Sequence, residues 1–378
     1  MGGCGLSDSY PQDPAKKTAA IAYTKTMATQ SLFSIVNTLH GHLARAARDQ
    51  REFHTRLRNL KPGEAIFTFD KAASGHVPKY TDTQGEFMNA PPYFATVVHW
   101  KDKHNRVRTR VYVTVHKKVE KGKGGSRTEF SQLEAAIRQA KKELPEIKRA
   151  TVLVDGASTM RNSRFPAYTL LLLHSLGVKT SGKVRFAATS HLKDYTGLGP
   201  DVVFAWINSR WRRLTELLKK EWRDDERVDG IIQSVMSPHL SVLERVCVAV
   251  VTPDTDSTWP DFKWKEVKTW HTMELVDAGT EGSVDAGSGC AYLVTNWNGM
   301  VAAEPTRGEL SKVPKVAAAF KTTISDPHAI VWKSRSVADP ADGDLEDAPA
   351  GVMGRFSERP ADAEVRDVCV LASGVAHE

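Results

Sequence analysis

The sequence predicts an α/β fold in which helices flank a mixed β-sheet, with a helical segment before the sheet and a small β-rich subdomain after it. Strand-like and helix-like segments alternate between about residues 62 and 222. Two short apolar strands in this region each end in an aspartate, at Asp70 and at Asp155. With 41% hydrophobic and 26% charged residues, the composition is that of a globular chain with a substantial core.

Residues 1–61 are predicted to form a flexible start followed by a long helix. Residues 1–14 are rich in Gly, Ser and Pro. Between Ala15 and Leu60, apolar residues recur at the three- and four-residue steps of one helix face, as in Leu32, Val36, Leu39 and Leu43. The segment Lys61-Pro-Gly63 then ends the helix.

Three strands are predicted next. Glu64 to Asp70 is a compact strand that ends in a carboxylate, and Phe94 to Trp100 is the second strand. Val107 to Val119 alternates between apolar and polar residues, which is typical of a third strand. Lys101 to Asn105, between the second and third strands, has the polar character of a hairpin loop.

Helices and strands then alternate. Phe130 to Leu144 predicts an amphipathic helix, and the continuously apolar Ala150 to Asp155 predicts a buried parallel strand. A second helix is expected over Phe165 to Leu176, and a further strand over Val184 to Ala188. Another helix begins at Pro200-Asp201, because Pro fits the first helical position and an acidic residue suits a helix N-terminus.

The last third of the chain is predicted to form a β-rich subdomain and a disordered tail. Strand-like pieces occur at residues 246–251, 291–295 and 329–332. Beyond them, acidic residues together with Ala, Pro and Gly indicate disorder. We therefore expect residues 1–61 to be the N-terminal segment, 62–230 the catalytic domain, 231–336 the β-rich subdomain and 337–378 the acidic tail.

Charge and cysteine content narrow the function classes. A formal charge of +7 favours a polyanionic partner. The cysteines have no C-x-x-C spacing, which argues against a disulfide framework and against a cysteine zinc site: Cys4, Cys247, Cys290 and Cys369. No apolar run is long enough to span a membrane, so we expect no membrane partner and an intracellular, soluble chain.

The two strand-end aspartates indicate a metal site. Ligands bind beyond the carboxyl ends of the strands in α/β sheets, where Asp70 and Asp155 are expected to meet. Phosphodiester cleavage with divalent metals needs such a group of carboxylates. Oxygen ligands of this kind suit Mg²⁺ or Mn²⁺.

Three segments resemble blocks of transposon-derived DDE proteins of the RNase H-like superfamily. Val154 to Arg164, VDGASTMRNSR, resembles their S-D-G-A-x-x-Q-F-K-N-R block. Phe186 to Gly199, FAATSHLKDYTGLG, is similar to their T-S-H-G-K…D-G-I-G block. His42 to Asp70 resembles the helix and strand that lead to their first carboxylate. The blocks keep their order over roughly residues 42 to 215.

This resemblance implies an RNase H-like mixed five-stranded sheet and a metal-dependent DNA polynucleotidyl transferase or nuclease, transposase- or integrase-like, from a transposable element. It implies DNA as the partner and the nucleus as the location in a eukaryote, and it is compatible with a homo-oligomer. Asp70, Asp155 and a third carboxylate would bind the metal and would be catalytic, together with His191. The residues expected to contact nucleic acid are Arg161, Asn162, Lys193, Arg210 and Arg213.

The chain departs from the family pattern at the third carboxylate. Thr196 stands where the Asp before Gly-Ile-Gly is expected, so Asp201 or Asp194 must replace it. We prefer Asp201, since the first turn of its helix can point at the strand ends. After Asp70 the chain also reads Lys-Ala-Ala-Ser, without the Glu-Asn-Tyr of the family. These departures support an alternative, a catalytically inactive, domesticated relative that binds nucleic acid.

The remaining basic residues also predict a phosphate track around the carboxylates. The arginines of the third strand are the first of these groups, the lysines of the connector before the next helix are the second, and the arginines after residue 208 are the third. Each group on its own is also typical of a solvated face. Asn162 has a second interpretation, because it can cap the helix that follows it.

Overall fold

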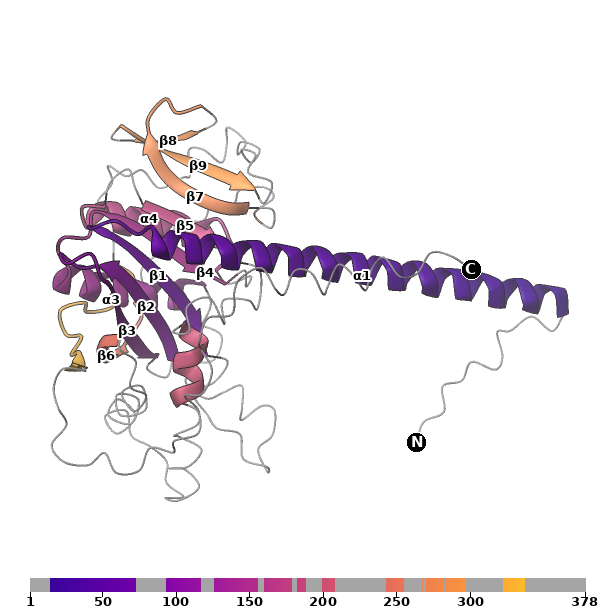
Figure 1. Ribbon diagram of the computed structural model, residues 1–378, viewed down its shortest axis with the longest axis horizontal. Coiled ribbons are helices and arrows are strands. Elements are labelled where there is room, and N and C mark those ends of the chain that lie inside the picture. Colours follow the sequence, from indigo (N-terminus) through magenta and orange to yellow (C-terminus); the bar gives the residue numbers. More distant parts are fainter. Residues whose placement is uncertain are drawn as a thin grey trace, which may run out of the picture. The chain divides into compact units, whose positions relative to one another are not determined.

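The computed structural model describes residues 14–72, 93–116, 126–155, 160–178, 182–187, 199–207, 243–254, 267, 270–281, 283–287, 289–296 and 322–336. Its helices are α1 (Pro14–Arg58), α3 (Ser126–Glu143) and α4 (Arg164–Ser175), and residues 200–207 are also helical (Figure 1). Side chains of α1 are described from Lys25 onward. None of the described helices is long and apolar enough to cross a membrane.

A ten-stranded mixed sheet organises these elements, in the order β10-β6-β3-β2-β1-β4-β5-β7-β9-β8. Its strands are β1 (Glu64–Lys71), β2 (Tyr93–Lys101), β3 (Val107–His116), β4 (Arg149–Val154), β5 (Gly182–Phe186), β6 (Leu243–Val251), β7 (Trp270–Asp277), β8 (Val284–Gly287), β9 (Cys290–Asn296) and β10 (Lys333–Ser336).

The centre of the sheet consists of the five strands expected from the sequence. β1, β2 and β3 form an antiparallel meander, and β4 and β5 run parallel to β1. The order of elements from α1 to β5 also follows the expected alternation. The described residues therefore form a mixed α/β fold around this central group of strands.

The expected five-stranded sheet is too small. β6 pairs in parallel with β3, and β7 pairs antiparallel with β5, so residues beyond 242 extend the sheet at both edges. Pairing satisfies the backbone groups that β3 and β5 would otherwise expose as edge strands. Residues 329–332, expected as a strand, lie just before the short strand β10 instead.

Helices α3 and α4 cover one face of the central strands. Phe130 and Phe165, one from each helix, meet at 5.9 Å in an edge-to-face contact. Beneath them Phe69 of β1 stacks on Phe94 of β2 at 5.9 Å. Val154 of β4 belongs to the same buried cluster. The main core lies on this face of the sheet. Because side chains alternate along a strand, the residues next to Phe69 and Val154 point to the opposite face.

The opposite face is covered by α1 and by residues 200–207. Phe53 of α1 packs with Ile66 of β1 and Leu153 of β4. Phe204 lies 5.3 Å from Tyr93 at the start of β2, in a second buried cluster over β2, β3 and β6. The two faces of the sheet therefore have different coverings.

The start of β1 is set by a glycine turn. Gly63 has a φ of +79°, in the left-handed region that favours glycine, and an added Cβ would lie 3.3 Å from the carbonyl oxygen of Glu146. The carbonyl oxygen of Gly63 accepts hydrogen bonds from the backbone N–H groups of Lys148 and Arg149. The turn that ends the N-terminal helix thus also joins β1 to the beginning of β4.

Candidate functional site

Asp70 and Asp155 lie at neighbouring positions of two parallel strands. Phe69 pairs with Val154 in register, so Asp70 and Asp155 each stand one residue beyond that pair, at the same end of the sheet. Neighbouring strands are about 4.8 Å apart. Both aspartates are half-buried. The sequence therefore identified a real juxtaposition of two carboxyl-bearing positions.

Both aspartates belong to the face of the sheet opposite α3 and α4. Side chains alternate along a strand, and Phe69 and Val154 belong to the cluster under those two helices. Ile66 and Leu153 face α1 instead. The alternation thus assigns Asp70 and Asp155 to the side covered by α1 and by residues 200–207.

Asp201 occurs on the same side of the sheet. Its helical segment packs through Phe204 on Tyr93, and the carbonyl oxygen of Tyr93 accepts a hydrogen bond from the backbone N–H of Ala72, two residues after Asp70. Asp201 is half-buried, one turn before Phe204. The structure therefore brings this candidate to the end of the sheet that carries Asp70.

A further carboxylate, Glu129, was not predicted from the sequence. It lies in the first turn of α3 and is 2% exposed. Lys71 Nζ is 3.2 Å from Glu129 Oε1, and Lys71 directly follows Asp70. Glu129 Oε2 is buried and has no hydrogen-bond partner among the described residues. An unsatisfied buried carboxylate oxygen is costly, so this atom is suited to a ligand.

Arg161 lies near Asp155. Its guanidinium stands 5.5 Å from the ring centroid of Phe186, and Nη2 donates a hydrogen bond to the carbonyl oxygen of Trp270. Burial lowers the pKa of the Arg161 guanidinium, whereas the negative charge of Asp155 acts in the opposite direction. Arg161 therefore places positive charge next to one of the two strand-end carboxylates.

Asn162 acts as a helix cap. Its Oδ1 accepts hydrogen bonds from the backbone N–H groups of Arg164 and Phe165, at 3.0 Å each. Its Nδ2 donates to Ser126 Oγ at the start of α3. These bonds tie the N-termini of α3 and α4 together, which matches the capping interpretation of this residue.

Several predicted site residues lie outside the described residues. These are His191, Lys193, Asp194, Thr196, Arg210 and Arg213. Their assignment to catalysis, to the metal or to nucleic-acid contacts stays a prediction.

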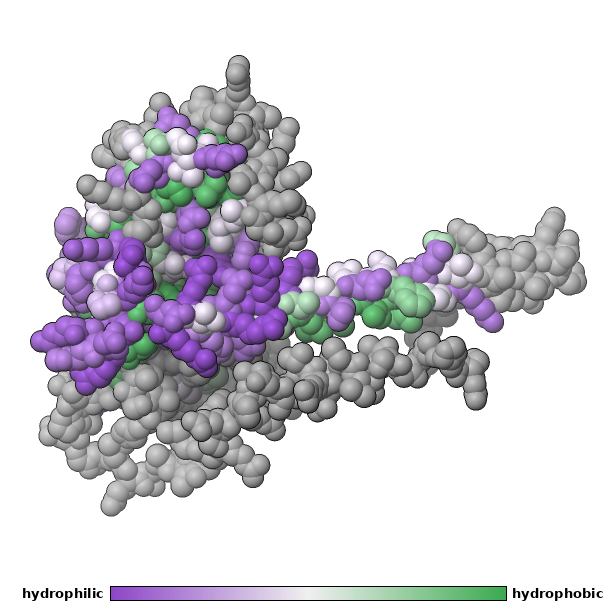
Figure 2. Space-filling model, turned by 45° about the horizontal axis from the view of Figure 1, so that its top comes forward, coloured by the Kyte–Doolittle hydropathy of each residue, from purple (hydrophilic) through white to green (hydrophobic). Residues whose placement is uncertain are grey.

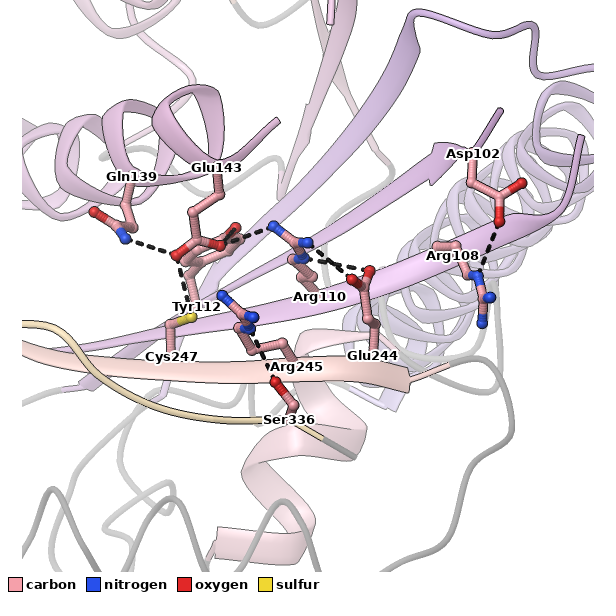
Figure 3. Close-up of polar contacts among 10 residues, drawn as sticks. All are labelled: Asp102, Arg108, Arg110, Tyr112, Gln139, Glu143, Glu244, Arg245, Cys247 and Ser336. Atoms are coloured by element: carbon pink, nitrogen blue, oxygen red, sulfur yellow. Dashed lines mark hydrogen bonds and ion pairs between the residues drawn. The ribbon is translucent and has the colours of Figure 1, made fainter. Parts of the chain in front are cut away.

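The arginines of β3 do not surround the carboxylates, contrary to the expected phosphate track. Arg108 and Arg110 pair with the last residues of β2, which in turn pair with the first residues of β1. These arginines therefore lie at the opposite end of the sheet from Asp70. Arg108 bonds to Asp102 in the hairpin, as Figure 3 shows. Arg110 is buried and binds Glu143 at 2.9 Å and Glu244 at 2.8 Å. These side chains hold the fold together.

Glu143 is the centre of this second polar group (Figure 3). It accepts hydrogen bonds from Arg110, from Tyr112 Oη and from Gln139 Nε2. Burial, and next the negative charge of Glu143, raise the pKa of Tyr112, so the phenol stays protonated. The group joins the C-terminal end of α3 to β3 and β6, and its donors are engaged within the protein.

A buried ion-pair cluster attaches α1 to the sheet. Asp49 Oδ1 lies 2.6 Å from Arg185 Nη2 on β5 and 3.2 Å from His271 Nε2 on β7. Burial by itself raises the pKa of the Asp49 carboxyl, but the contacts with His271 and Arg185 outweigh it, so the pKa lies below its ordinary value. The ion pairs of Asp49 therefore stabilise the fold at pH values above the ordinary pKa of an aspartate. This stabilisation is lost as the pH falls through the lowered pKa of the folded protein.

The carboxylates have the right chemistry for a hard divalent cation. Asp70, Asp155, Asp201 and the free oxygen of Glu129 supply oxygen ligands only, as Mg²⁺ prefers. Among the described residues, however, no three His, Cys, Asp or Glu side chains are close enough to form a metal-binding group. The oxygen ligands are of the type that this ion prefers. The four carboxylates lie at one end of the sheet, but the described side chains do not form a complete metal-binding group.

A scan against protein-family models found no match, and a search of curated proteins found no similar sequence. Among solved structures, the chain has a weak similarity to the crystal structure of the NurA nuclease from Sulfolobus solfataricus. The two chains are 10% identical, the alignment covers 80% of this chain and 88% of that chain, and the TM-score is 0.20. At this TM-score the similarity bears on neither the fold nor the activity.

Proposed function

We propose that this chain is an RNase H-like, metal-dependent DNA nuclease or polynucleotidyl transferase, related to transposon-derived DDE proteins, with Asp70 and Asp155 at its catalytic centre. One observation carries the proposal: the two aspartates follow a register pair on adjacent parallel strands and belong to the same face of the sheet. The strand order β3-β2-β1-β4-β5, with only β2 antiparallel to its neighbours, supports the RNase H-like assignment.

In this proposal Asp70 and Asp155 hold Mg²⁺ or Mn²⁺ at the end of the sheet. When bound, the ion supplies the Lewis-acid chemistry of phosphodiester cleavage. Asp201 or Glu129 completes the ligand set, Asp201 from the face that carries the aspartates and Glu129 from the first turn of α3. Arg161, beside Asp155, is suited to orient a phosphate of the substrate.

Lys71 favours the alternative, an inactive relative that binds nucleic acid. Its ammonium group pairs with Glu129 at the candidate site, where it neutralises one of the carboxylates that a metal would need. A positive charge at this place repels a divalent cation and attracts a phosphate. The same contact is therefore compatible with DNA binding without cleavage.

The test is cleavage of labelled DNA by the full chain in the presence of Mg²⁺ or Mn²⁺. We expect Asp70→Asn and Asp155→Asn each to lower the rate by about a hundredfold or more, because each removes a ligand charge. Salt-sensitive DNA binding should remain. Glu129→Gln and Asp201→Asn identify the third ligand, since only the true one should reduce cleavage to the same degree.

Asp277→Asn is a matched control. Asp277 is also an aspartate at a strand end, but it is exposed and lies beyond the beginning of β5, at the other end of the sheet. Its substitution should leave cleavage unchanged. Unaltered cleavage in Asp155→Asn would overturn the assignment. Absent cleavage with retained DNA affinity in the unsubstituted chain would select the inactive relative.

A further inference from the structure

From Lys25 to Leu43, α1 carries an apolar face that no described residue covers. Figure 2 shows hydrophobic surface gathered along this helix. Every described side chain from Lys25 to His40 is exposed. The large apolar side chains of this stretch are 45–65% exposed: Met27, Leu32, Phe33, Ile35, Val36, Leu39 and Leu43. Residues 25–43 span about 28 Å of helix, long enough for an interface.

Four of these seven apolar residues follow a heptad pattern. With Val36 and Leu43 at position a, Leu32 and Leu39 fall at position d. The polar residues fall at the outward positions b, c and f, such as Gln30, Ser31, Ser34, Asn37 and Thr38. This spacing is that of a coiled-coil seam and differs from the scattered exposure of single apolar residues.

The same seam continues into an established contact of the fold. The next a and d residues are Ala46, Gln50, Phe53 and Leu57. Of these, Ala46 and Phe53 are only 5–8% exposed, and Phe53 and Leu57 pack on the sheet. One face of α1 is thus buried against this chain's own sheet from Ala46 onward and is exposed from Lys25 to His40.

The bare part of the seam is also free of charge. No Asp, Glu, Lys or Arg occurs between Thr26 and Ala44. A helix that lies on an anionic membrane surface needs Lys or Arg on its polar face, and this one has none there. An oppositely charged protein partner has nothing to bind. A second copy of the same segment meets no like-charge repulsion.

We propose that residues 26–44 of α1 pair with the same residues of a second copy of this chain, in a parallel, in-register, two-stranded coiled coil. Val36 at position a, between Leu32 and Leu39 at position d, favours two parallel strands. A symmetric pair needs a self-complementary surface, which this seam provides. This inference is independent of the proposed nuclease activity.

The positions that flank the seam are complementary in a parallel pair. Position g of one helix meets position e of the next heptad in the partner. Ala28 then meets Phe33, and Ile35 meets His40. A small residue faces a large one in the first contact, and the second contains no charge pair. The e and g positions therefore widen the apolar interface and add no charge repulsion to it.

Sedimentation velocity on the full chain, from about 1 to about 100 µM, tests the pairing. We expect a species of twice the 41.7 kDa monomer that dissociates on dilution. Substituting Leu32→Glu and Leu39→Glu together should weaken self-association by about a hundredfold or more, because it buries unpaired like charges in the seam. Both side chains are exposed in the single chain, so folding should persist and circular dichroism should show it.

Ser31→Glu with Thr38→Glu is the matched control. It adds the same charges, with the same seven-residue spacing, at the outward position next to each leucine. This variant should associate like the unsubstituted chain. A chain that stays monomeric throughout the concentration range, or a leucine variant that associates as strongly as the control, would overturn the proposal.

Cysteine cross-linking tests the parallel register. Facing d positions of a parallel pair lie close enough for a disulfide, so Leu39→Cys should form a covalent dimer on mild oxidation. Ser34→Cys, at the outward position f, should give no more dimer than the unsubstituted chain. Equal cross-linking by the two variants would contradict a parallel, in-register pair.

Discussion

At the scale of single residues, partly and fully buried polar groups distinguish the two ends of the sheet. At one end Asp70 and Asp155 are half-buried, and a buried oxygen of Glu129 has no partner among the described residues. At the other end Glu143 accepts hydrogen bonds from three side chains of β3 and α3. Satisfied groups hold a fold together, and an unsatisfied one is available to a ligand. The neighbouring half-buried carboxyl groups of Asp70 and Asp155 are why we assign function to the first end.

The buried His99 of β2 should make the free energy of unfolding depend on pH. It faces α1, where its ring lies 6.2 Å from that of Phe53, and burial lowers its pKa to about 4. The ordinary value is about 6.5, so between these pH values the unfolded chain binds a proton that the folded one does not. The free energy of unfolding should therefore fall by about 3 kcal/mol as the pH is lowered from 6.5 to 4.

Urea unfolding at several pH values measures this effect. His99→Gln keeps a polar group near Thr109, the hydrogen-bond partner of His99, and removes the titration. The slope of stability against pH should be smaller in His99→Gln than in the unsubstituted chain. His104→Gln, in the exposed hairpin, is the control. If His99→Gln retained the full slope, another group would have to be responsible for it.

Asp70 and Asp155 could be predicted from the sequence because each follows an apolar strand. An apolar strand and the order of the elements can be recognised from residues that are close together in the chain. Glu129 could not be predicted in this way, since an acidic residue in a first helical turn usually interacts with the helix dipole. Its contact with Lys71 joins residues 58 positions apart in the chain. Such a contact depends on how α3 lies on the sheet, which no local pattern contains.

At the scale of elements, α1 is held by charge as well as by apolar packing. Asp49 and Arg185 are each at most 4% exposed, and Arg185 also pairs with Glu52. Asp49→Asn should lower the free energy of unfolding by about 3 kcal/mol, because it leaves a buried guanidinium with one partner fewer. Urea unfolding measures the loss, and faster hydrogen exchange in the second half of α1 should accompany it.

Arg48→Gln is the control for the helix. It removes a pair with Glu52 within the same helix, in which the Arg48 side chain is about half exposed. Surface pairs of this type contribute about 0.5 kcal/mol or less. A loss in Asp49→Asn no larger than that in Arg48→Gln would mean that the buried cluster does not stabilise the attachment of α1.

Elements with a clear period could be predicted, and those formed by pairing alone could not. α3 and β1 to β5 follow helical spacing or continuous apolar runs. β10 has the sequence KSRS, which contains no apolar residue, and it forms a strand because Lys333 to Ser336 pair with β6. The hydrogen bonds of the neighbouring strand override the local propensity in this case.

At the scale of the whole molecule, the sheet continues beyond the predicted catalytic domain of residues 62–230. β3 pairs with β6 from Thr109 to His116, and β5 pairs with β7. A chain that ends at residue 230 would therefore expose two strands that are internal in the full sheet. Val111, Val113 and Val115 of β3 are buried in the complete chain. A long, exposed, hydrophobic edge of this kind promotes aggregation.

We expect the chain shortened to residues 1–230 to aggregate on refolding, and a chain shortened to residues 1–338 to remain soluble, since the latter keeps every described strand. Light scattering during dilution from urea measures the difference, and both chains share α1, so its seam affects them equally. The physical reason is that β6 and β7 supply backbone partners and apolar cover that no described residue before 208 replaces. A soluble short chain with one cooperative unfolding transition would instead establish residues 62–230 as a self-sufficient domain, to which β6 to β10 add little stability.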